Sequence, residues 1–169
     1  MDQNITFIGG GNMAQALISG MIARGLPATR ITVSVPGPEI QEVLRQQDIN
    51  VTDNNAEAIA NADVVVVAVK PQMLADVLTP LADLMTNQLV ISIAAGATIG
   101  IFKSLLGGYD RIIRVMPNTP AMIGEGMIVF ESGDSLTAEE HAFCETLFGS
   151  VGDVISVEPK LMDAVTAVS

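Results

Sequence analysis

A glycine-rich turn follows an apolar stretch within the first residues of the chain, in the run Ile5–Ala14. Gly9 permits a tight turn out of a strand, Gly11 lets the backbone approach a pyrophosphate, and Ala14 stands where helix and strand pack closely. A helix that starts here points unpaired N–H groups at phosphates. The pattern predicts a dinucleotide-binding site, and a purely structural glycine turn is the alternative.

We expect the phosphate-binding turn to consist of Gly9, Gly10, Gly11, Asn12, Met13 and Ala14. Asn12 has a second interpretation, because an Asn side chain at this place can cap the helix even where no cofactor binds. The two roles are compatible.

Ser34 ends the next β-branched stretch, where NAD-specific proteins of this fold carry an acid that binds the ribose 2′-hydroxyl. A hydroxyl is compatible with a 2′-phosphate, so NADP(H) is favoured. The following segment Val35–Glu39 has no Arg or Lys, its two prolines lack N–H donors, and Glu39 would repel a phosphate if it pointed inward. NAD(H) therefore stays possible.

Three further segments follow buried strands, where ligands of open α/β sheets collect. Lys70 in Ala68-Val69-Lys70-Pro71 can neutralise pyrophosphate charge or orient ribose hydroxyls, and surface solvation is the alternative. The small residues of Ala94-Ala95-Gly96 suit a backbone lying against the nicotinamide ribose, or close helix packing.

In Met116-Pro117-Asn118-Thr119-Pro120 two prolines hold Asn118 and Thr119 in a fixed loop. Their amide and hydroxyl can face the nicotinamide carboxamide or the substrate, and a plain turn is the alternative.

The composition argues against several other kinds of site. We expect no metal site, no Ser-His-Asp arrangement, and a surface position for the single histidine, His141. The only cysteine, Cys144, cannot form an internal disulfide and is interpreted as a helix-face residue. A net charge of −11 argues against a nucleic-acid surface. No apolar run approaches the roughly 20 residues of a membrane helix, and without a signal-peptide pattern the cytoplasm is the expected location.

Strands and helices alternate along the chain, which predicts an α/β fold: a doubly wound, mostly parallel, Rossmann-like sheet. The predicted strands are 5–8, 31–35, 50–52, 62–69, 89–93, 111–115, 126–130 and 153–157. The predicted helices begin after the glycine turn and cover about 39–47, 56–60, 71–81 with an interruption at Pro80, 99–106 and 138–148.

A new amphipathic helix begins at Pro159, with Leu161, Met162, Val165 and Val168 apolar. Either this apolar face is left uncovered, or the helix packs back on the sheet. We expect a dinucleotide-binding domain over 1–158 and, over 159–169, the first helix of a following helical domain.

The motifs together resemble one enzyme family, pyrroline-5-carboxylate reductase. They are IGGGNMA at 8–14, AVKP at 68–71, SIAAG at 92–96, RVMPNTPA at 114–121 and DAVTAVS at 163–169, in matching order over the whole chain. The resemblance adds Asn55 as a side chain near the adenosine, with helix capping as the alternative. Family members are longer and continue into a helical dimerisation domain, so this chain resembles the cofactor domain alone.

The resemblance implies an oxidoreductase of proline biosynthesis. Hydride passes from NADPH or NADH to the C=N carbon of 1-pyrroline-5-carboxylate, giving L-proline. It further implies a homodimer or higher homo-oligomer, and substrate-binding and catalytic residues beyond Ser169, so that the fragment alone is expected to be inactive. Two alternatives remain: a 3-hydroxyacid dehydrogenase of the 6-phosphogluconate type, and a non-catalytic NAD(P)-sensing module.

Overall fold

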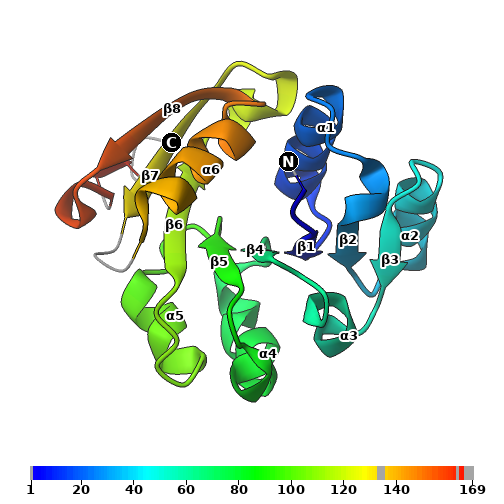
Figure 1. Cartoon of the computed structure of the whole chain (residues 1–169), viewed down its shortest axis with the longest axis horizontal. Helices are drawn as coiled ribbons and strands as arrows, with labels where there is room; N and C mark the ends of the chain where they lie inside the picture. Colours follow the sequence, from blue (N-terminus) through cyan, green and yellow to red (C-terminus); the bar gives the residue numbers. More distant parts are fainter. Residues whose placement is uncertain (1, 133–135, 163, 166–169) are drawn as a thin grey trace.

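A single eight-stranded sheet organises the computed structural model, which describes residues 2–132, 136–162 and 164–165 (Figure 1). The strands in chain order are β1 (Ile5–Ile8), β2 (Ile31–Ser34), β3 (Asn50–Thr52), β4 (Val64–Val67), β5 (Leu89–Ser92), β6 (Ile112–Pro117), β7 (Gly126–Ser132) and β8 (Gly152–Val157).

The strand order is β3-β2-β1-β4-β5-β6-β7-β8. The strands from β3 to β6 pair in parallel, β7 runs antiparallel to β6, and β8 is parallel to β7. The chain builds outward from β1 to β3, then returns to β4 and builds in the other direction. This reversal between β1 and β4 confirms the predicted doubly wound, mostly parallel α/β fold.

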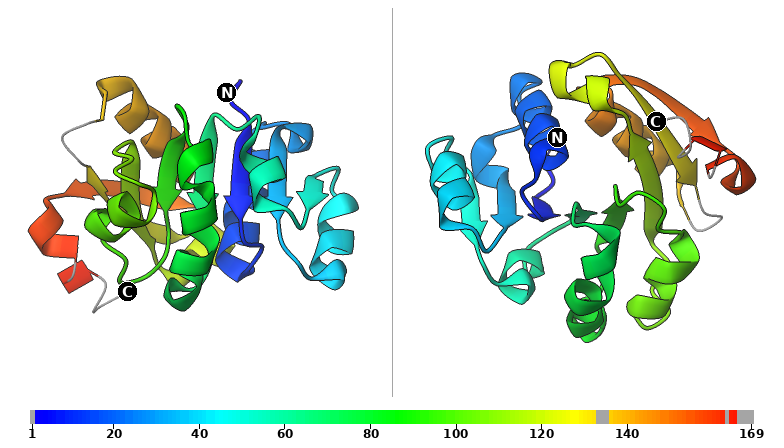
Figure 2. Two further views of the ribbon diagram at one scale, coloured as in Figure 1. Left: turned by 90° about the horizontal axis from the view of Figure 1, so that it is seen from below. Right: turned by 180° about the vertical axis from the view of Figure 1, so that it is seen from behind.

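Helices cover both faces of the sheet. The α-helices are α1 (Asn12–Ala23), α2 (Pro38–Arg45), α3 (Asn55–Ile59), α4 (Leu74–Leu78), α5 (Ile99–Leu105) and α6 (Ala138–Phe148), and the 3₁₀ turns are η1 (Ala28–Arg30), η2 (Pro71–Met73), η3 (Thr79–Leu84), η4 (Thr119–Ile123) and η5 (Pro159–Leu161). One apolar cluster joins the sheet to α1, α2 and α6, and a second joins it to α3, α4 and α5. The views from below and behind in Figure 2 show both layers.

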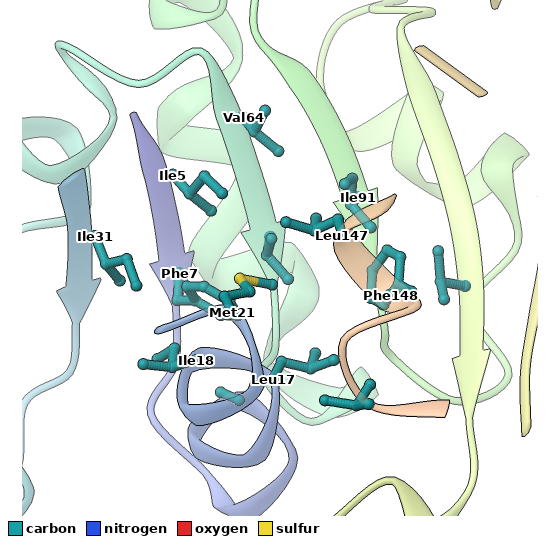
Figure 3. Close-up of a cluster of buried hydrophobic side chains, with 14 of the residues drawn as sticks. Ile5, Phe7, Leu17, Ile18, Met21, Ile31, Val64, Ile91, Leu147 and Phe148 are labelled. Carbon is teal, nitrogen blue, oxygen red and sulfur yellow. The ribbon is translucent and has the colours of Figure 1, made fainter. Parts of the chain in front are cut away.

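The larger cluster lies where α1 and α6 meet the sheet (Figure 3). Phe7 of β1, Met21 of α1 and Phe148 of α6 are fully buried there. Burying each such side chain contributes about 1.5–3 kcal/mol. All four residues of β4 are buried, as the uninterrupted valine run predicts for a strand with both faces covered.

Several predicted boundaries shift. The strand expected over 62–69 is only Val64–Val67, while the strand expected to end at Val115 continues to Pro117 because Met116 and Pro117 pair with β7. The predicted interruption at Pro80 is confirmed: α4 ends at Leu78 and the chain continues as the 3₁₀ turn η3.

The sequence left open whether the apolar face after β8 is uncovered or packs back on the sheet. Met162 is completely buried and Val165 is half-buried, so at these two residues the structure favours packing. Leu161, by contrast, is 46% exposed. Val168 lies outside the described residues.

His141 is half-buried rather than fully exposed, because its ring lies 5.5 Å from that of Phe130. Cys144 is buried on the inner side of α6. None of the helices in the described ranges is long and apolar enough to span a membrane.

Candidate functional site

The segments predicted to bind a ligand follow parallel strands, so the fold brings them to one edge of the sheet. In spatial order they are Ser34 at the end of β2, the turn 9–14 after β1, 68–71 after β4, 94–96 after β5, and 118–119 after β6. Ligands of open α/β sheets bind outside the carboxyl ends of the strands, at the point where strand order reverses. The glycine turn lies at this point.

Gly9 has a conformation that side chains rarely adopt. Its φ is +103°, and a Cβ there would lie 2.7 Å from the carbonyl oxygen of Ala68. Its N–H donates to the Ser34 carbonyl oxygen at 2.9 Å. The fold itself therefore requires glycine at this position, because β1 leaves the sheet between the ends of β2 and β4.

Gly11 is different, because nothing in the folded chain requires it. It is the N-cap of α1, with an extended backbone that any residue can adopt, and a Cβ built there meets nothing within 4 Å. Open space beside glycine at a helix start fits a group that approaches the backbone closely. The first turn of α1 carries no acidic residue, and the unpaired N–H groups at a helix start favour an anion such as a pyrophosphate.

The predicted cap at Asn12 is wrong. Gly11 is the N-cap, Asn12 is the first helical residue, and no side chain caps α1. Asn12 is exposed, Met13 is half-buried and Ala14 is buried against the sheet, where a small residue was expected. Gln15 was not predicted as part of this turn. Its side-chain amide donates to the Gly10 carbonyl oxygen at 2.8 Å and so connects the turn to α1.

Ser34 and Asn55, which lie far apart in the sequence, are in contact. The Ser34 hydroxyl donates to Asn55 Oδ1 at 2.6 Å, and Ser34 is only 3% exposed. Asn55 does not cap α3, because Asn54 accepts from the backbone N–H groups of Ala56 and Glu57. With its oxygen bound to Ser34, Asn55 has the N–H₂ group of its amide left as a hydrogen-bond donor.

Gln41 lies near this end of the predicted site and was not predicted. Its amide donates at 2.6 Å to the carbonyl oxygen of Val35, the residue after β2. This bond satisfies a backbone acceptor that would otherwise face a bound ribose or phosphate. No sequence pattern indicates this role, because it depends on how the chain turns between the end of β2 and α2.

The segment 68–71 leaves β4 beside the glycine turn. The Ala68 N–H donates to the Ile8 carbonyl oxygen at 2.9 Å, and Ala68 and Val69 are half-buried. Lys70 is exposed and precedes Pro71, which starts the 3₁₀ turn η2, whereas the α-helix expected from Pro71 begins only at Leu74. An exposed ammonium next to the turn can meet the negative charge of a phosphate.

The segment 94–96 follows β5 and has little side-chain bulk. Ala94 is buried and its N–H donates to the Ser92 hydroxyl oxygen at 3.3 Å. Ala95 and Gly96 are exposed, and Gly96 has a φ of +74° with nothing within 4 Å of a built Cβ. The backbone here is open to a ligand lying across the edge.

Asn118 and Thr119 follow β6. The Oδ1 atom of Asn118 accepts from the backbone N–H of Met127 at 2.9 Å, while Thr119 is exposed. A hollow of about 490 Å³ between α1 and η4 is bordered by Asn12 of the turn and by Ala121 and Met122. This hollow runs along α1 and is bordered by neither Asn118 nor Thr119.

A second cavity, of about 420 Å³, lies at the opposite edge near the start of β4 and β5. The one basic side chain among its lining residues, Arg111, is already paired, since its guanidinium donates to the Glu140 carboxylate and to Asn87. We place no ligand there.

Comparisons with known proteins agree with this arrangement. The family model described as "NADP oxidoreductase coenzyme F420-dependent" matches residues 4–96. Pyrroline-5-carboxylate reductase of Haemophilus influenzae is 41% identical over 98% of this chain and 62% of its own length. The solved pyrroline-5-carboxylate reductase of Coxiella burnetii is 34% identical, with a TM-score of 0.95 over 100% of this chain and 64% of that one.

A Plasmodium falciparum pyrroline carboxylate reductase, solved with NADP bound, is 28% identical, with a TM-score of 0.89 over 99% of this chain and 62% of that one. The chain thus spans about three fifths of the length of these relatives. It belongs to the NADP oxidoreductase coenzyme F420-dependent family, and within it corresponds to the N-terminal cofactor domain of the pyrroline-5-carboxylate reductases.

Proposed function

We propose that this chain is the cofactor-binding part of an enzyme that reduces 1-pyrroline-5-carboxylate to L-proline with NADPH, and less readily with NADH. The observation that carries the proposal is that all the predicted ligand-binding segments lie along the carboxyl edge of the sheet. Among them, position 11 is a glycine although the fold alone does not require one there. The high similarity to pyrroline-5-carboxylate reductases over nearly the whole chain supports the same reaction.

Different residues of this edge bind different parts of the dinucleotide. The backbone N–H groups at the start of α1 hold the pyrophosphate, and Lys70 adds a positive charge beside it. Ala95 and Gly96 leave room for the nicotinamide ribose, and Thr119 lies at the reactive end. When bound, the reduced nicotinamide supplies the hydride; the protein places it against the electrophilic C=N carbon, so that positioning is the main catalytic contribution.

Cofactor choice rests on Ser34 and Asn55. No carboxylate ends β2, and the N–H₂ end of Asn55 is a hydrogen-bond donor to the 2′-position. Donors favour a phosphate, which only accepts. The Plasmodium falciparum relative with bound NADP supports this preference.

The remaining parts of the proposal concern the whole protein. Residues 1–158 form the cofactor domain, and 159–169 begin a helical domain that holds the imino acid and joins subunits into a homodimer or larger homo-oligomer in the cytoplasm. The share of the relatives' length that this chain leaves unmatched supports a further domain. We propose no metal and no nucleic-acid partner.

The test compares this 169-residue chain with a chain extended to the relatives' length. Both should bind NADPH in a calorimetric titration, but only the extended chain should oxidise it with pyrroline-5-carboxylate. Orientation of the two reactants is worth on the order of 7–11 kcal/mol, and the short chain does not supply it. Full activity of the short chain would contradict the domain assignment. Binding without reduction by the extended chain would overturn the reductase assignment in favour of a sensing module.

A further inference from the structure

We propose that Asn118 is a positioning residue: its side chain fastens the loop after β6 to the start of β7, so that Thr119, and not Asn118, meets the reactants. This inference rests on the proposed function, because it concerns the reactive end of the same site.

The side chain of Asn118 takes over where the β6–β7 ladder ends. The last paired residues are Pro117 and Ile128. Proline has no N–H to donate, so the backbone of β6 cannot continue a regular ladder through this position. One residue further, Asn118 Oδ1 accepts from the Met127 N–H at 2.9 Å. A side-chain hydrogen bond therefore takes the place that the next backbone hydrogen bond between β6 and β7 would have.

The rest of the loop is closed by backbone contacts. Ala121 N–H donates to the Asn118 carbonyl oxygen, and Glu125 N–H donates to the Pro120 carbonyl oxygen, both at 3.1 Å. At the far end, a Cβ on Gly126 would lie 2.7 Å from the Cβ of Ala121, so β7 begins in close contact with η4. The loop is therefore one unit, joined to the sheet on the Thr119 side through Asn118.

Thr119 is the residue that this unit presents to the edge. It is exposed at the carboxyl end of β6, beside the end of β5, where the open backbone of Ala95 and Gly96 lies. Asn118 Oδ1 accepts the Met127 N–H, which fixes the side chain against the start of β7, and the N–H₂ group is the part of Asn118 whose direct contact the substitutions below must exclude. The geometry thus gives Asn118 an indirect role through Thr119.

Two substitutions separate an indirect role from direct contact. Asn118→Leu keeps the size of the side chain and removes the acceptor, while Asn118→Asp keeps an oxygen for the Met127 N–H and removes the N–H₂ group. Gln88→Leu is the matched control. Gln88 Oε1 likewise accepts backbone N–H groups, from Thr86 and Asn87, but at the opposite edge of the sheet.

The measurements are hydrogen exchange of the Met127 amide and hydride transfer by the extended chain with deuterated NADPH. Asn118→Leu should speed Met127 exchange and slow hydride transfer by about tenfold or more, with a larger isotope effect and an almost unchanged NADPH dissociation constant. Asn118→Asp should restore Met127 protection and most of the hydride-transfer rate, and Gln88→Leu should change neither.

Two results would overturn the inference. One is an Asn118→Leu enzyme whose hydride transfer is unchanged although Met127 exchanges freely. The other is an Asn118→Asp enzyme as slow as Asn118→Leu although Met127 stays protected, because this identifies the N–H₂ group as a direct contact. A wild-type extended chain that fails to reduce pyrroline-5-carboxylate contradicts the proposed function instead, and the exchange measurement still tests the bond between Asn118 and Met127.

Discussion

Two glycines of the same turn are present for different reasons. Gly9 is required by the backbone, with φ at +103° and the Ala68 carbonyl oxygen in the way of a side chain. Gly11 has an ordinary extended conformation with open space around it. Gly9 is therefore required for the stability of the fold, whereas we propose that Gly11 leaves room for the ligand.

Substituting each glycine tests this division. Gly11→Val should lower the free energy of unfolding by about 0.5–2 kcal/mol, the range of N-cap exchanges, but should abolish NADPH binding. Gly9→Ala should destabilise the chain by about 1–3 kcal/mol, because it strains the backbone as well as overlapping Ala68. Urea unfolding and NADPH titration of both variants give the answer. Unchanged affinity in Gly11→Val would show that no phosphate lies against this residue.

Ser34 allows a test of cofactor choice. Ser34→Asp places a carboxylate, which only accepts, beside Asn55 Oδ1, so the amide must turn its N–H₂ end toward Asp and away from the ribose. The ratio of NADH to NADPH affinity should rise by about tenfold or more, since the new charge also repels a 2′-phosphate.

Thr6→Val is the control for Ser34→Asp. It removes another buried strand hydroxyl that bonds to α3, through the Ala58 carbonyl oxygen at 2.8 Å, away from the ribose. It should lower stability and leave the affinity ratio unchanged. If wild type already prefers NADH by about tenfold, the assignment of Ser34 is wrong.

At the scale of elements, α6 is fixed to the sheet at its first turn. Thr137 and Glu140 form a capping box, and the Arg111 Nε donates to Glu140 at 3.2 Å. Burial raises the pKa of Glu140, but hydrogen bonds from Thr137 and Arg111, together with the Arg111 charge, outweigh it and hold the pKa below its ordinary value. A lowered folded pKa stabilises the fold above the unfolded pKa and ceases to do so as pH falls through the folded value.

Glu140→Gln isolates that contribution, because glutamine retains an oxygen for the capping bonds and lacks the charge. The stability difference between wild type and variant should be largest near neutral pH and shrink as pH falls below about 4. Urea titrations at several pH values measure it, with Glu145→Gln, an exposed position on the same helix, as the reference. A difference that grows toward acid pH would contradict the assignment.

The elements also show what the sequence could predict. Alternating strands and helices, the valine run of β4 and the glycine turn are local patterns, so they predicted the fold and the order of site segments along the edge. Cross-strand contacts are not local. The buried pair of Arg114 and Glu131, 3.6 Å apart across the antiparallel β6–β7 pairing, and the Ser34–Asn55 bond depend on register and packing, which no single segment contains.

At the scale of the whole molecule, one apolar cluster joins β1, α1 and α6 (Figure 3). A contiguous core of this kind makes cooperative unfolding the expected behaviour. Cys144 is a probe inside it: the residue is completely buried, and burial, with the charges of Glu140 and Glu145, raises the pKa of its thiol to about 12.

Labelling of Cys144 should therefore report the unfolding of the chain. Thiol reagents attack the thiolate, which the native state hardly contains, so the native protein should react only through opened molecules with an ordinary thiol pKa of about 8.5. Because Cys144 is the only cysteine, the signal comes from one site. The labelling rate should rise with urea along the slope of global unfolding, and Gly9→Ala should accelerate it by the factor that its loss of stability predicts. Fast labelling in native buffer, indifferent to urea and to Gly9→Ala, would mean instead that α6 opens on its own, and the core that joins it to α1 would not be a single cooperative unit.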